Sequence, residues 1–323
     1  MGGAPSTWVL APSYLRGGGG EGPRVEYGGA PWCGRACPTF RPSGCATAMR
    51  PPRPADPPTE VPPEWLRLLA ALPADGRLLA VGPPDTGKST LCWWLAAELA
   101  KRGSAAVVDA DIGQSRVGPP ASVGWLKLGA PNSEFYFVGA TNPARRPASH
   151  FRATLAACGG AAASGAAWSV IDTTGYLTGE DAVTLKREKI QRLRPVQVLA
   201  IGEHEDLERI LVPFQDDSAV TIHHLPRPAA AREKPRADRS RWRVEGFREW
   251  LAGSNLRWIG REGRTFAHAP APELFAGSPE LASQLRGLLL GFSDQGRRGV
   301  CIGLLHSVDW HEGRILAHCP DDA

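Results

Sequence analysis

The chain has 323 residues, of which 42% are hydrophobic, and a formal net charge of +4 at neutral pH. This composition can build one main domain with an appendage. No apolar run approaches the length that spans a membrane, which excludes membrane-spanning proteins as a class. The chain starts without the basic-then-apolar layout of a secretory signal, and its seven cysteines include no C-x-x-C pair. These features predict reduced thiols and a cytoplasmic protein with no membrane partner.

Residues 1–62 predict a disordered extension. They hold 12 of the 30 prolines and 11 of the 37 glycines, and they show little apolar periodicity. Cys33, Cys37 and Cys45 fall here without a fourth ligand for tetrahedral zinc, so unrelated thiols are the preferred interpretation. Met49 lies shortly before the first periodic segment, which leaves open whether translation starts at Met1 or at Met49.

Residues 63–255 alternate between short apolar runs and helical patterns. The apolar runs predict strands at 78–81, 105–108, 135–138, 168–171, 196–201 and 219–222. This alternation predicts an α/β domain with a mostly parallel sheet flanked by helices. Right-handed crossovers bring the carboxyl ends of parallel strands to one edge of the sheet, so the residues after each strand are candidates for a functional site.

The first of these strands leads into the pattern G-x-x-x-x-G-K-S and then into a helical segment. This order is typical of a phosphate-binding loop (P-loop) and makes a chance glycine-rich turn a poor explanation. The glycines let backbone N–H groups converge on phosphate oxygens, while Lys88 can reach the terminal phosphates and the Ser89 hydroxyl can bind Mg²⁺. The predicted nucleotide-binding residues are Gly82, Pro83, Pro84, Asp85, Thr86, Gly87, Lys88, Ser89 and Thr90.

Carboxylates follow the second and fourth of the predicted strands. Asp111 can hold a Mg²⁺-bound water or accept a proton from an attacking hydroxyl, although such a turn is as often only a solvated strand end. The P-loop upstream favours the functional interpretation. Asp172 opens the run D-T-T-G-Y, which suits a group near the terminal phosphate or its metal, with helix capping as the alternative. Gly175 in this run is predicted to lie against the nucleotide.

Four of these segments together carry a family resemblance. The P-loop, the turn at 111–114, the segment 137–143 and the run from 172 to 195 resemble the polynucleotide 5′-hydroxyl kinases of RNA processing. These include the kinase subunit of the pre-mRNA cleavage machinery and the kinase of pre-rRNA processing. The resemblance extends from about residue 61 to the C-terminus, and its strength lies in the order of the motifs.

The resemblance implies roles for individual residues. Asp111 would activate the 5′-hydroxyl, and Gln114 would lie beside the metal. A clasp formed by Thr141, Asn142 and Pro143 would hold the substrate end, although many relatives have serine where this chain has Asn142.

The family also has an Arg-x-x-x-Arg lid over the phosphates, and Arg239 and Arg243 match it best because Phe247 follows at the family's spacing. Arg232 and Arg236 have the same spacing and are the alternative. Residues 227–248 hold eight basic and three acidic residues, a local excess of five positive charges. This excess suits a phosphate-rich partner, although a solvated basic helix face is the ordinary alternative.

Residues 256–323 contain short alternating runs that predict a small β-rich C-terminal domain, as the family has. The eukaryotic relatives also carry a folded β domain before the kinase core, for which residues 1–62 are a poor substitute.

The resemblance therefore implies an enzyme that uses ATP and Mg²⁺ to phosphorylate the 5′-hydroxyl end of RNA or DNA. Ser89 and Asp111 are the predicted metal residues, and Lys88, Asp111, Arg239 and Arg243 are the predicted catalytic ones. Tyr176 is a predicted substrate-binding residue, and Tyr176, Trp125 or Tyr136 could stack a terminal base, because no spacing selects among the three. Two other functions remain open: a P-loop ATPase that acts as a nucleotide-driven switch, and a scaffold that binds ATP only for stability.

Overall fold

The computed structural model describes residues 6–11, 52–131, 133–260, 264–267, 285–309 and 311–320. By contacts the chain divides into two compact units. The larger unit is Met49–Trp250, and the smaller unit combines Met1–Ala48 with Leu251–Ala323. The predicted start of the C-terminal domain, at residue 256, lies a few residues after this division.

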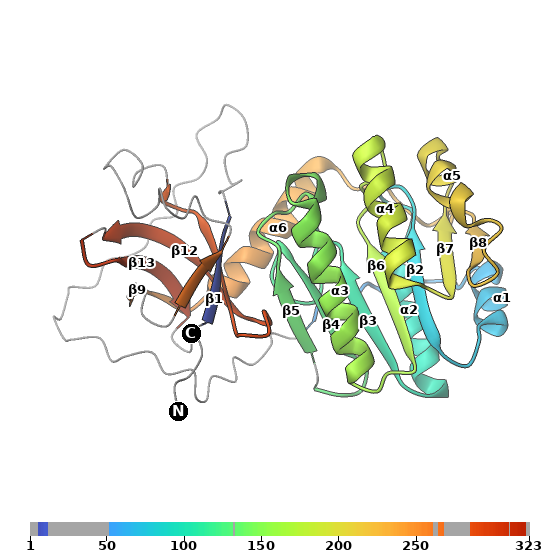
Figure 1. Cartoon of the computed structure of the whole chain (residues 1–323). Helices are drawn as coiled ribbons and strands as arrows, with labels where there is room; N and C mark the ends of the chain where they lie inside the picture. The colour runs from blue at the N-terminus through green and yellow to red at the C-terminus, as the bar shows by residue number, and fades with distance from the viewer. Residues whose placement is uncertain are drawn as a thin grey trace. The chain divides into compact units, whose positions relative to one another are not determined.

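A seven-stranded sheet forms the centre of the larger unit, in the order β5-β4-β3-β6-β2-β7-β8 (Figure 1). The five strands from β3 to β8 in this order pair in parallel, whereas β3–β4 and β4–β5 pair antiparallel. The strands are β2 (Gly76–Val81), β3 (Ala105–Ala110), β4 (Ser122–Lys127), β5 (Ser133–Phe137), β6 (Trp168–Thr173), β7 (Gln197–Ile201) and β8 (Thr221–Leu225).

Helices cover both faces of this sheet (Figure 1). Alternate residues of β2 point to opposite faces of the sheet and so belong to two separate cores. Leu79 and Val81 pack with α3, α4 and α5, whereas Leu78 and Ala80 pack with α1 and α2. The helices are α1 (Pro63–Ala71), α2 (Lys88–Arg102), α3 (Pro147–Ala163), α4 (Glu180–Leu193), α5 (Glu205–Leu211) and α6 (Arg236–Leu251), with short 3₁₀ turns η1 (Pro143–Arg145) and η2 (Val212–Phe214). None of the described helices is both long and apolar enough to cross a bilayer.

The edge at β4 and β5 differs from the sequence prediction. β4 was not predicted, and β5 runs antiparallel rather than parallel to its neighbour. The links β3–β4 and β4–β5 contain no helix. A parallel pair needs a crossover of a dozen or more residues, so these short links produce an antiparallel edge on a mostly parallel sheet.

The smaller unit is a six-stranded sheet in the order β10-β1-β11-β12-β13-β9. Its strands are β1 (Ser6–Ala11), β9 (Ser254–Gly260), β10 (Arg264–Ala267), β11 (Leu289–Ser293), β12 (Gly299–Asp309) and β13 (Arg314–Pro320). All neighbours pair antiparallel except β1 and β10. Ser6–Ala11 thus forms a strand inside the segment predicted to be disordered, while Cys33, Cys37, Cys45 and Met49 lie outside the described residues.

Candidate active site

The P-loop joins β2 to α2, and α2 begins at Lys88. Gly87 caps the helix with a left-handed backbone (φ +84°), and Asp85 also has a positive φ of +58°. A Cβ atom at Gly82 would collide with the carbonyl oxygen of Ile201 at the end of β7, so only glycine fits. The loop therefore lies at the carboxyl edge of the sheet, and the free N–H groups at the start of α2 make it a ready anion site.

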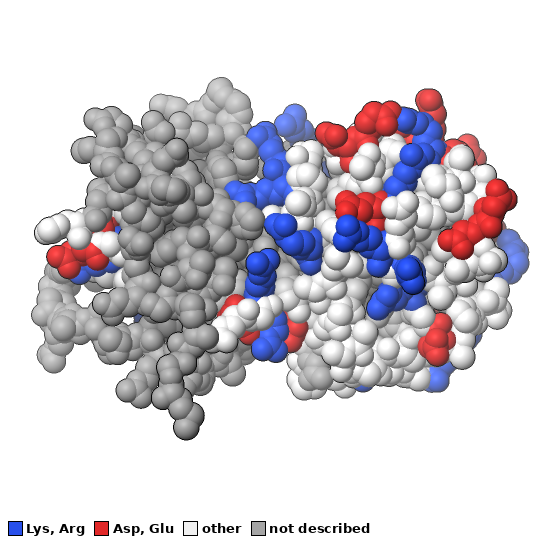
Figure 2. Space-filling view, viewed as in Figure 1, with Lys and Arg blue, Asp and Glu red and all other residues white. Residues whose placement is uncertain are grey.

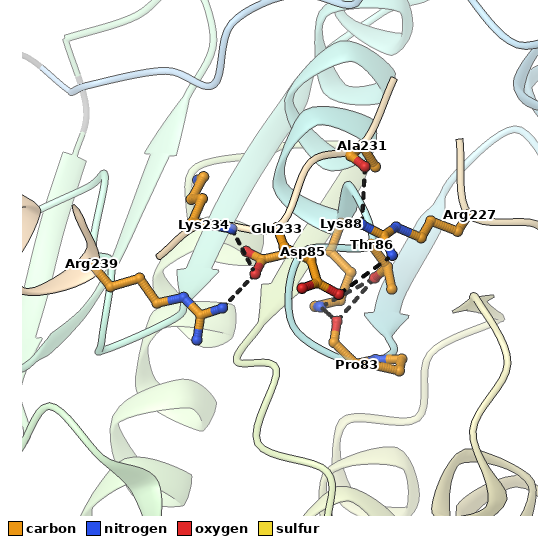
Figure 3. Close-up of polar contacts among 9 residues, drawn as sticks. All are labelled: Pro83, Asp85, Thr86, Lys88, Arg227, Ala231, Glu233, Lys234 and Arg239. Carbon is orange, nitrogen blue, oxygen red and sulfur yellow. Dashed lines mark hydrogen bonds and ion pairs between the residues drawn. The ribbon is translucent and has the colours of Figure 1, made fainter. Parts of the chain in front are cut away.

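The Lys88 ammonium is buried at this edge, with 6% of the residue exposed. It donates to the carbonyl oxygen of Pro83 and lies 3.4 Å from the Thr86 hydroxyl oxygen, which itself donates to Pro83 at 3.0 Å (Figure 3). Burial lowers the pKa of Lys88, and the nearby carboxylates of Asp172 and Asp111 oppose this shift. Lys88 therefore lies within electrostatic reach of both acids.

Asp172 is the penultimate residue of β6, and the loop that follows this strand lies against the P-loop. A Cβ atom at Gly175 would lie 2.7 Å from the backbone of Pro84, which shows how closely the loop after β6 approaches the P-loop. Burial and the Asp111 carboxylate raise the pKa of Asp172 to about 6, while an interaction with the Ser89 hydroxyl opposes the shift. The Oδ1 atom of Asp172 is buried and has no hydrogen-bond partner among the described residues.

The turn after β3 holds two aspartates in different environments. Asp109 is buried and accepts hydrogen bonds from the backbone N–H groups of Asp111 (3.0 Å), Arg116 (2.5 Å) and Val117 (3.0 Å). Burial and the Asp172 carboxylate raise the pKa of Asp109 to about 7. Asp109 is therefore a structural carboxylate that fixes the turn.

Asp111 is only partly buried. Its Oδ1 atom accepts from the backbone N–H groups of Gly113 (3.0 Å) and Gln114 (3.2 Å), and no donor among the described residues reaches Oδ2. A Cβ atom at Gly113 would lie 3.1 Å from the carbonyl oxygen of Thr141. The predicted clasp thus begins beside this turn.

The rest of the clasp belongs to η1. The Asn142 side chain caps this turn by accepting from the backbone N–H of Ala144 at 3.0 Å, and Pro143 is buried. Tyr176 follows Gly175 and is half-buried, but none of the contacts found among the described residues joins it to Thr141 or Asn142. The structure therefore brings Thr141 to the Asp111 turn without assembling the whole predicted substrate set.

The predicted lid arginines lie on α6 and point to the same edge. Arg239 forms an ion pair with Asp85, and the backbone N–H of Lys234 donates to the same carboxylate at 3.1 Å (Figure 3). Burial and the neighbouring guanidinium groups of Arg236 and Arg239 lower the pKa of Arg243, and Asp111 opposes the shift. Arg243 is therefore within electrostatic reach of Asp111, while Arg239 contacts the P-loop.

A cavity of about 410 Å³ opens beside the Arg239–Asp85 pair. Its lining comes from the P-loop, the end of β7, the segment before α6 and α6 itself: Pro83, Pro84, Asp85, Thr86, Gly202, Glu203, Arg227, Glu233 and Arg239.

Basic side chains also lie across the face of the larger unit that α3 and α4 cover (Figure 2).

A buried network of two lysines and a histidine beneath the site was not predicted. The Lys186 ammonium donates to the Thr173 hydroxyl (2.6 Å) and to the carbonyl of Thr174 (2.7 Å). Lys189 contacts the His150 ring at 3.2 Å, and that ring contacts the carbonyl of Ala110 at 2.9 Å.

Burial lowers the pKa of Lys186 well below its ordinary range and that of Lys189 to about 7. A sequence signal existed, because both lysines fall on the apolar stripe of α4, where they line up with Ala182, Ile190 and Leu193. Lys186 contacts the end of β6 directly, and Lys189 contacts the end of β3 through His150. The positions of Asp172 and Asp111 depend on these two strand ends.

Residues 82–253, more than half of the chain, match the family described as mRNA cleavage and polyadenylation factor CLP1 P-loop. The chain belongs to this family. The predicted family resemblance and the predicted α/β P-loop fold are thereby confirmed.

Relatives of this CLP1 P-loop chain carry kinase names. The chain is 30% identical over 217 residues to a polyribonucleotide 5′-hydroxyl-kinase of Methanocaldococcus jannaschii. The aligned region covers 62% of this chain and 58% of that protein. It is 31% identical over 199 residues to a polyribonucleotide 5′-hydroxyl-kinase of Pyrococcus furiosus, with 58% and 54% covered. The chain thus spans little more than half the length of these curated relatives.

A solved structure of wild-type Clp1p in complex with Pcf11p matches with a TM-score of 0.56 and 12% identity, over 79% of this chain and 73% of that one. At this identity the match establishes that the CLP1 P-loop chain shares the fold.

Proposed function

We propose that this protein transfers the γ-phosphate of ATP to the 5′-hydroxyl end of RNA. The observation that carries the proposal is the P-loop lysine Lys88 at the start of α2, together with Asp111 in the turn after β3, whose charge acts on both Lys88 and Arg243. Phosphoryl transfer needs a cation that binds the phosphates, a carboxylate that can accept a proton, and a further cation that neutralises the developing charge. The Lys88 ammonium, the Asp111 carboxylate and the Arg243 guanidinium can supply these groups. The relatives' names favour RNA over DNA as the substrate.

The P-loop would bind the triphosphate. The N–H groups at the start of α2 face the anion, and Lys88 can exchange its bond to Pro83 for bonds to phosphate oxygens. Arg239 and Arg243 would neutralise the charge that spreads over the equatorial oxygens during transfer.

Asp111 would accept the proton of the 5′-hydroxyl. As the new bond from O5′ to the γ-phosphorus forms, the bond to the bridging oxygen breaks and ADP leaves, while the hydroxyl proton moves to the carboxylate. The partnerless Oδ2 atom of Asp111 supports this role, because Oδ1 is already engaged by Gly113 and Gln114. Thr141 beside the turn supports a clasp of Thr141, Asn142 and Pro143 for the substrate end, with Gln114 and Tyr176 as further substrate contacts.

Ser89 and Asp172 would be the residues that hold Mg²⁺. The buried, unpartnered Oδ1 atom of Asp172 and the nearby Ser89 hydroxyl are the hard oxygen donors that this ion prefers. This differs from the prediction that paired Ser89 with Asp111. Among the described residues no three His, Cys, Asp or Glu side chains form a metal-ligand group, so phosphates and water would complete the shell.

A reducing, cytoplasmic setting is part of the proposal. Cys92 and Cys158 in the larger unit are buried free thiols, which suits a reducing compartment.

The test mixes the protein with Mg²⁺, terminally labelled ATP and an RNA oligonucleotide that has a free 5′-hydroxyl. Label is expected on the RNA with the wild type and not with Lys88→Ala, and a 5′-phosphorylated oligonucleotide should accept none. Label released only as free phosphate would instead support the nucleotide-driven switch, and ATP binding without turnover would support the scaffold.

A further inference from the structure

Two guanidinium groups meet on one indole ring of the predicted lid helix. The Cζ atom of Arg53 lies 4.3 Å from the centre of the Trp242 ring, and that of Arg116 lies 5.0 Å from it. Both distances are within the range of cation–π attraction. The indole N–H of Trp242 is buried without a hydrogen-bond partner among the described residues, so the ring face is what makes its polar contacts.

The two arginines come from segments far apart in the sequence but are joined through the backbone. The Arg53 N–H donates to the carbonyl of Arg116 at 2.9 Å. In return, the Arg116 guanidinium donates to the carbonyls of Arg53 (3.0 Å) and Pro54 (3.1 Å). These bonds hold the Arg116 guanidinium against the backbone of residues 53 and 54. The Arg53 side chain reaches the same ring and is paired with Glu249.

Arg116 belongs to the turn that presents the proposed base. Its backbone N–H donates to Oδ2 of Asp109, whose Oδ1 accepts from the backbone N–H of Asp111. Trp242 is the neighbour of Arg243 on α6. One short path of contacts therefore runs from the Asp111 turn through Arg116 and Trp242 to the lid arginine.

The following turns of α6 also lie against Arg53. A Cβ atom at Gly246 would lie 2.7 Å from the Arg53 guanidinium and 2.8 Å from Pro120, and Glu249 forms an ion pair with Arg53 at 3.7 Å. Glycine inside a helix is destabilising relative to alanine, so its presence here indicates that close approach is required. Positions 242, 246 and 249 form one stripe of the helix.

We propose that Arg53, Arg116 and Trp242 are positioning residues that hold α6 in register with the Asp111 turn and so set Arg243 against the reacting phosphate. Arg53 precedes the family match at 82–253, so the family assignment does not account for it. The inference rests on the proposed kinase function.

The test compares Trp242→Leu with Arg241→Met. Arg241 is the adjacent, exposed residue of α6, paired with Asp238 at 3.5 Å, and it does not contact the ring. Trp242→Leu is expected to lower kcat for transfer about tenfold or more, with the KM for ATP changed less than about threefold, because a small misplacement of a catalytic group is costly. Arg241→Met should stay within about twofold of the wild type, and Trp242→Phe, which keeps a π face, should recover most of the rate.

A double-mutant cycle separates positioning from general stability. Adding Arg243→Ala should reduce kcat much less in the Trp242→Leu background than in the wild type, because Arg243 is already misplaced there. Equal reductions in the two backgrounds, or a kcat of Trp242→Leu within about twofold of the wild type, would overturn the proposal.

Hydrogen exchange gives a readout that does not depend on kinase activity. Trp242→Leu should accelerate exchange of the Arg116 and Val117 amides, which Asp109 protects, and Arg241→Met should not. A wild type that transfers no phosphate would contradict the proposed function alone, whereas unchanged exchange at these two amides would contradict the positioning role.

Discussion

At the scale of single residues, burial rather than the sequence motif decides how the site's charged groups behave. Asp109 and Asp111 are two residues apart, yet the first is enclosed by three backbone N–H donors and the second keeps an oxygen available. The P-loop residues could be predicted because their spacing is tied to phosphate geometry. The separate roles of the two acids depend on which side of the strand end is covered, and that depends on the tertiary fold.

Asp172 yields a prediction about stability and pH. Its pKa in the folded protein, about 6, is above the ordinary 3.8, so folding disfavours the ionised form that prevails at neutral pH. The resulting loss of folding stability is at its full size above pH 6 and becomes smaller as the pH falls toward 4. Asp172→Asn, measured by urea unfolding without nucleotide or Mg²⁺, should therefore be more stable than the wild type by about 1–3 kcal/mol at pH 8 and by less at pH 5.

The same variant should lose Mg²⁺-dependent transfer, because an amide is a weaker ligand than a carboxylate at the proposed Mg²⁺ site. Asp216→Asn, at an exposed aspartate, is the matched control and should leave both properties unchanged. A variant less stable than the wild type at pH 8 would show that the Asp172 charge stabilises the fold.

At the scale of elements, apolar runs predicted β2, β3, β6 and β7 because buried parallel strands have nearly continuous hydrophobic sequences. β4 was missed because its sequence, Ser-Val-Gly-Trp-Leu-Lys, is interrupted by Gly124, and a Cβ atom there would collide with the backbone of Val117. The glycine that weakens the strand pattern is thus required by the packing of the Asp109–Val117 turn.

Helix α6, which carries the predicted lid arginines, gives a kinetic prediction. Arg243→Ala should lower kcat about 100-fold while changing the Kd for ATP less than about threefold, because the guanidinium contact strengthens only as charge develops in the transition state. Equilibrium ATP binding and steady-state transfer, each compared with Arg241→Ala, separate the two effects. Unchanged turnover would remove Arg243 from the mechanism.

The Arg239–Asp85 ion pair between α6 and the P-loop gives a second prediction for this helix. Asp85→Asn removes a negative charge beside the phosphate site and releases Arg239, and asparagine tolerates the left-handed backbone at this position. The Kd for ATP should fall about three- to tenfold. Calorimetric titration with ATP measures the Kd, and Glu245→Gln, at an exposed acid on α6, is the control. Weaker ATP binding by Asp85→Asn would mean that the Arg239–Asp85 pair instead supports the binding conformation of the P-loop.

At the scale of the whole molecule, long-range pairing limited what sequence patterns could reveal. Ser6–Ala11 pairs with strands more than 250 positions later, and Arg53 pairs with a loop more than 60 positions later. Both lie in a segment whose proline and glycine content predicts disorder, because composition reports local tendencies only. The α/β domain was predictable since its helices and strands alternate along the chain, whereas the partners of the N-terminal segment were not.

In the proposed mechanism, Asp111 deprotonates a 5′-hydroxyl next to a triphosphate that Lys88 holds. The most direct measurement is single-turnover transfer from ATP to a 5′-hydroxyl RNA, followed by mass spectrometry of the RNA, with wild type and Asp111→Asn at matched ATP occupancy. The wild type is expected to add one phosphoryl group to the RNA, and Asp111→Asn, with an ATP affinity within about twofold of the wild type, is expected to do so about 100-fold more slowly. Transfer by Asp111→Asn at the wild-type rate would contradict the proposed mechanism.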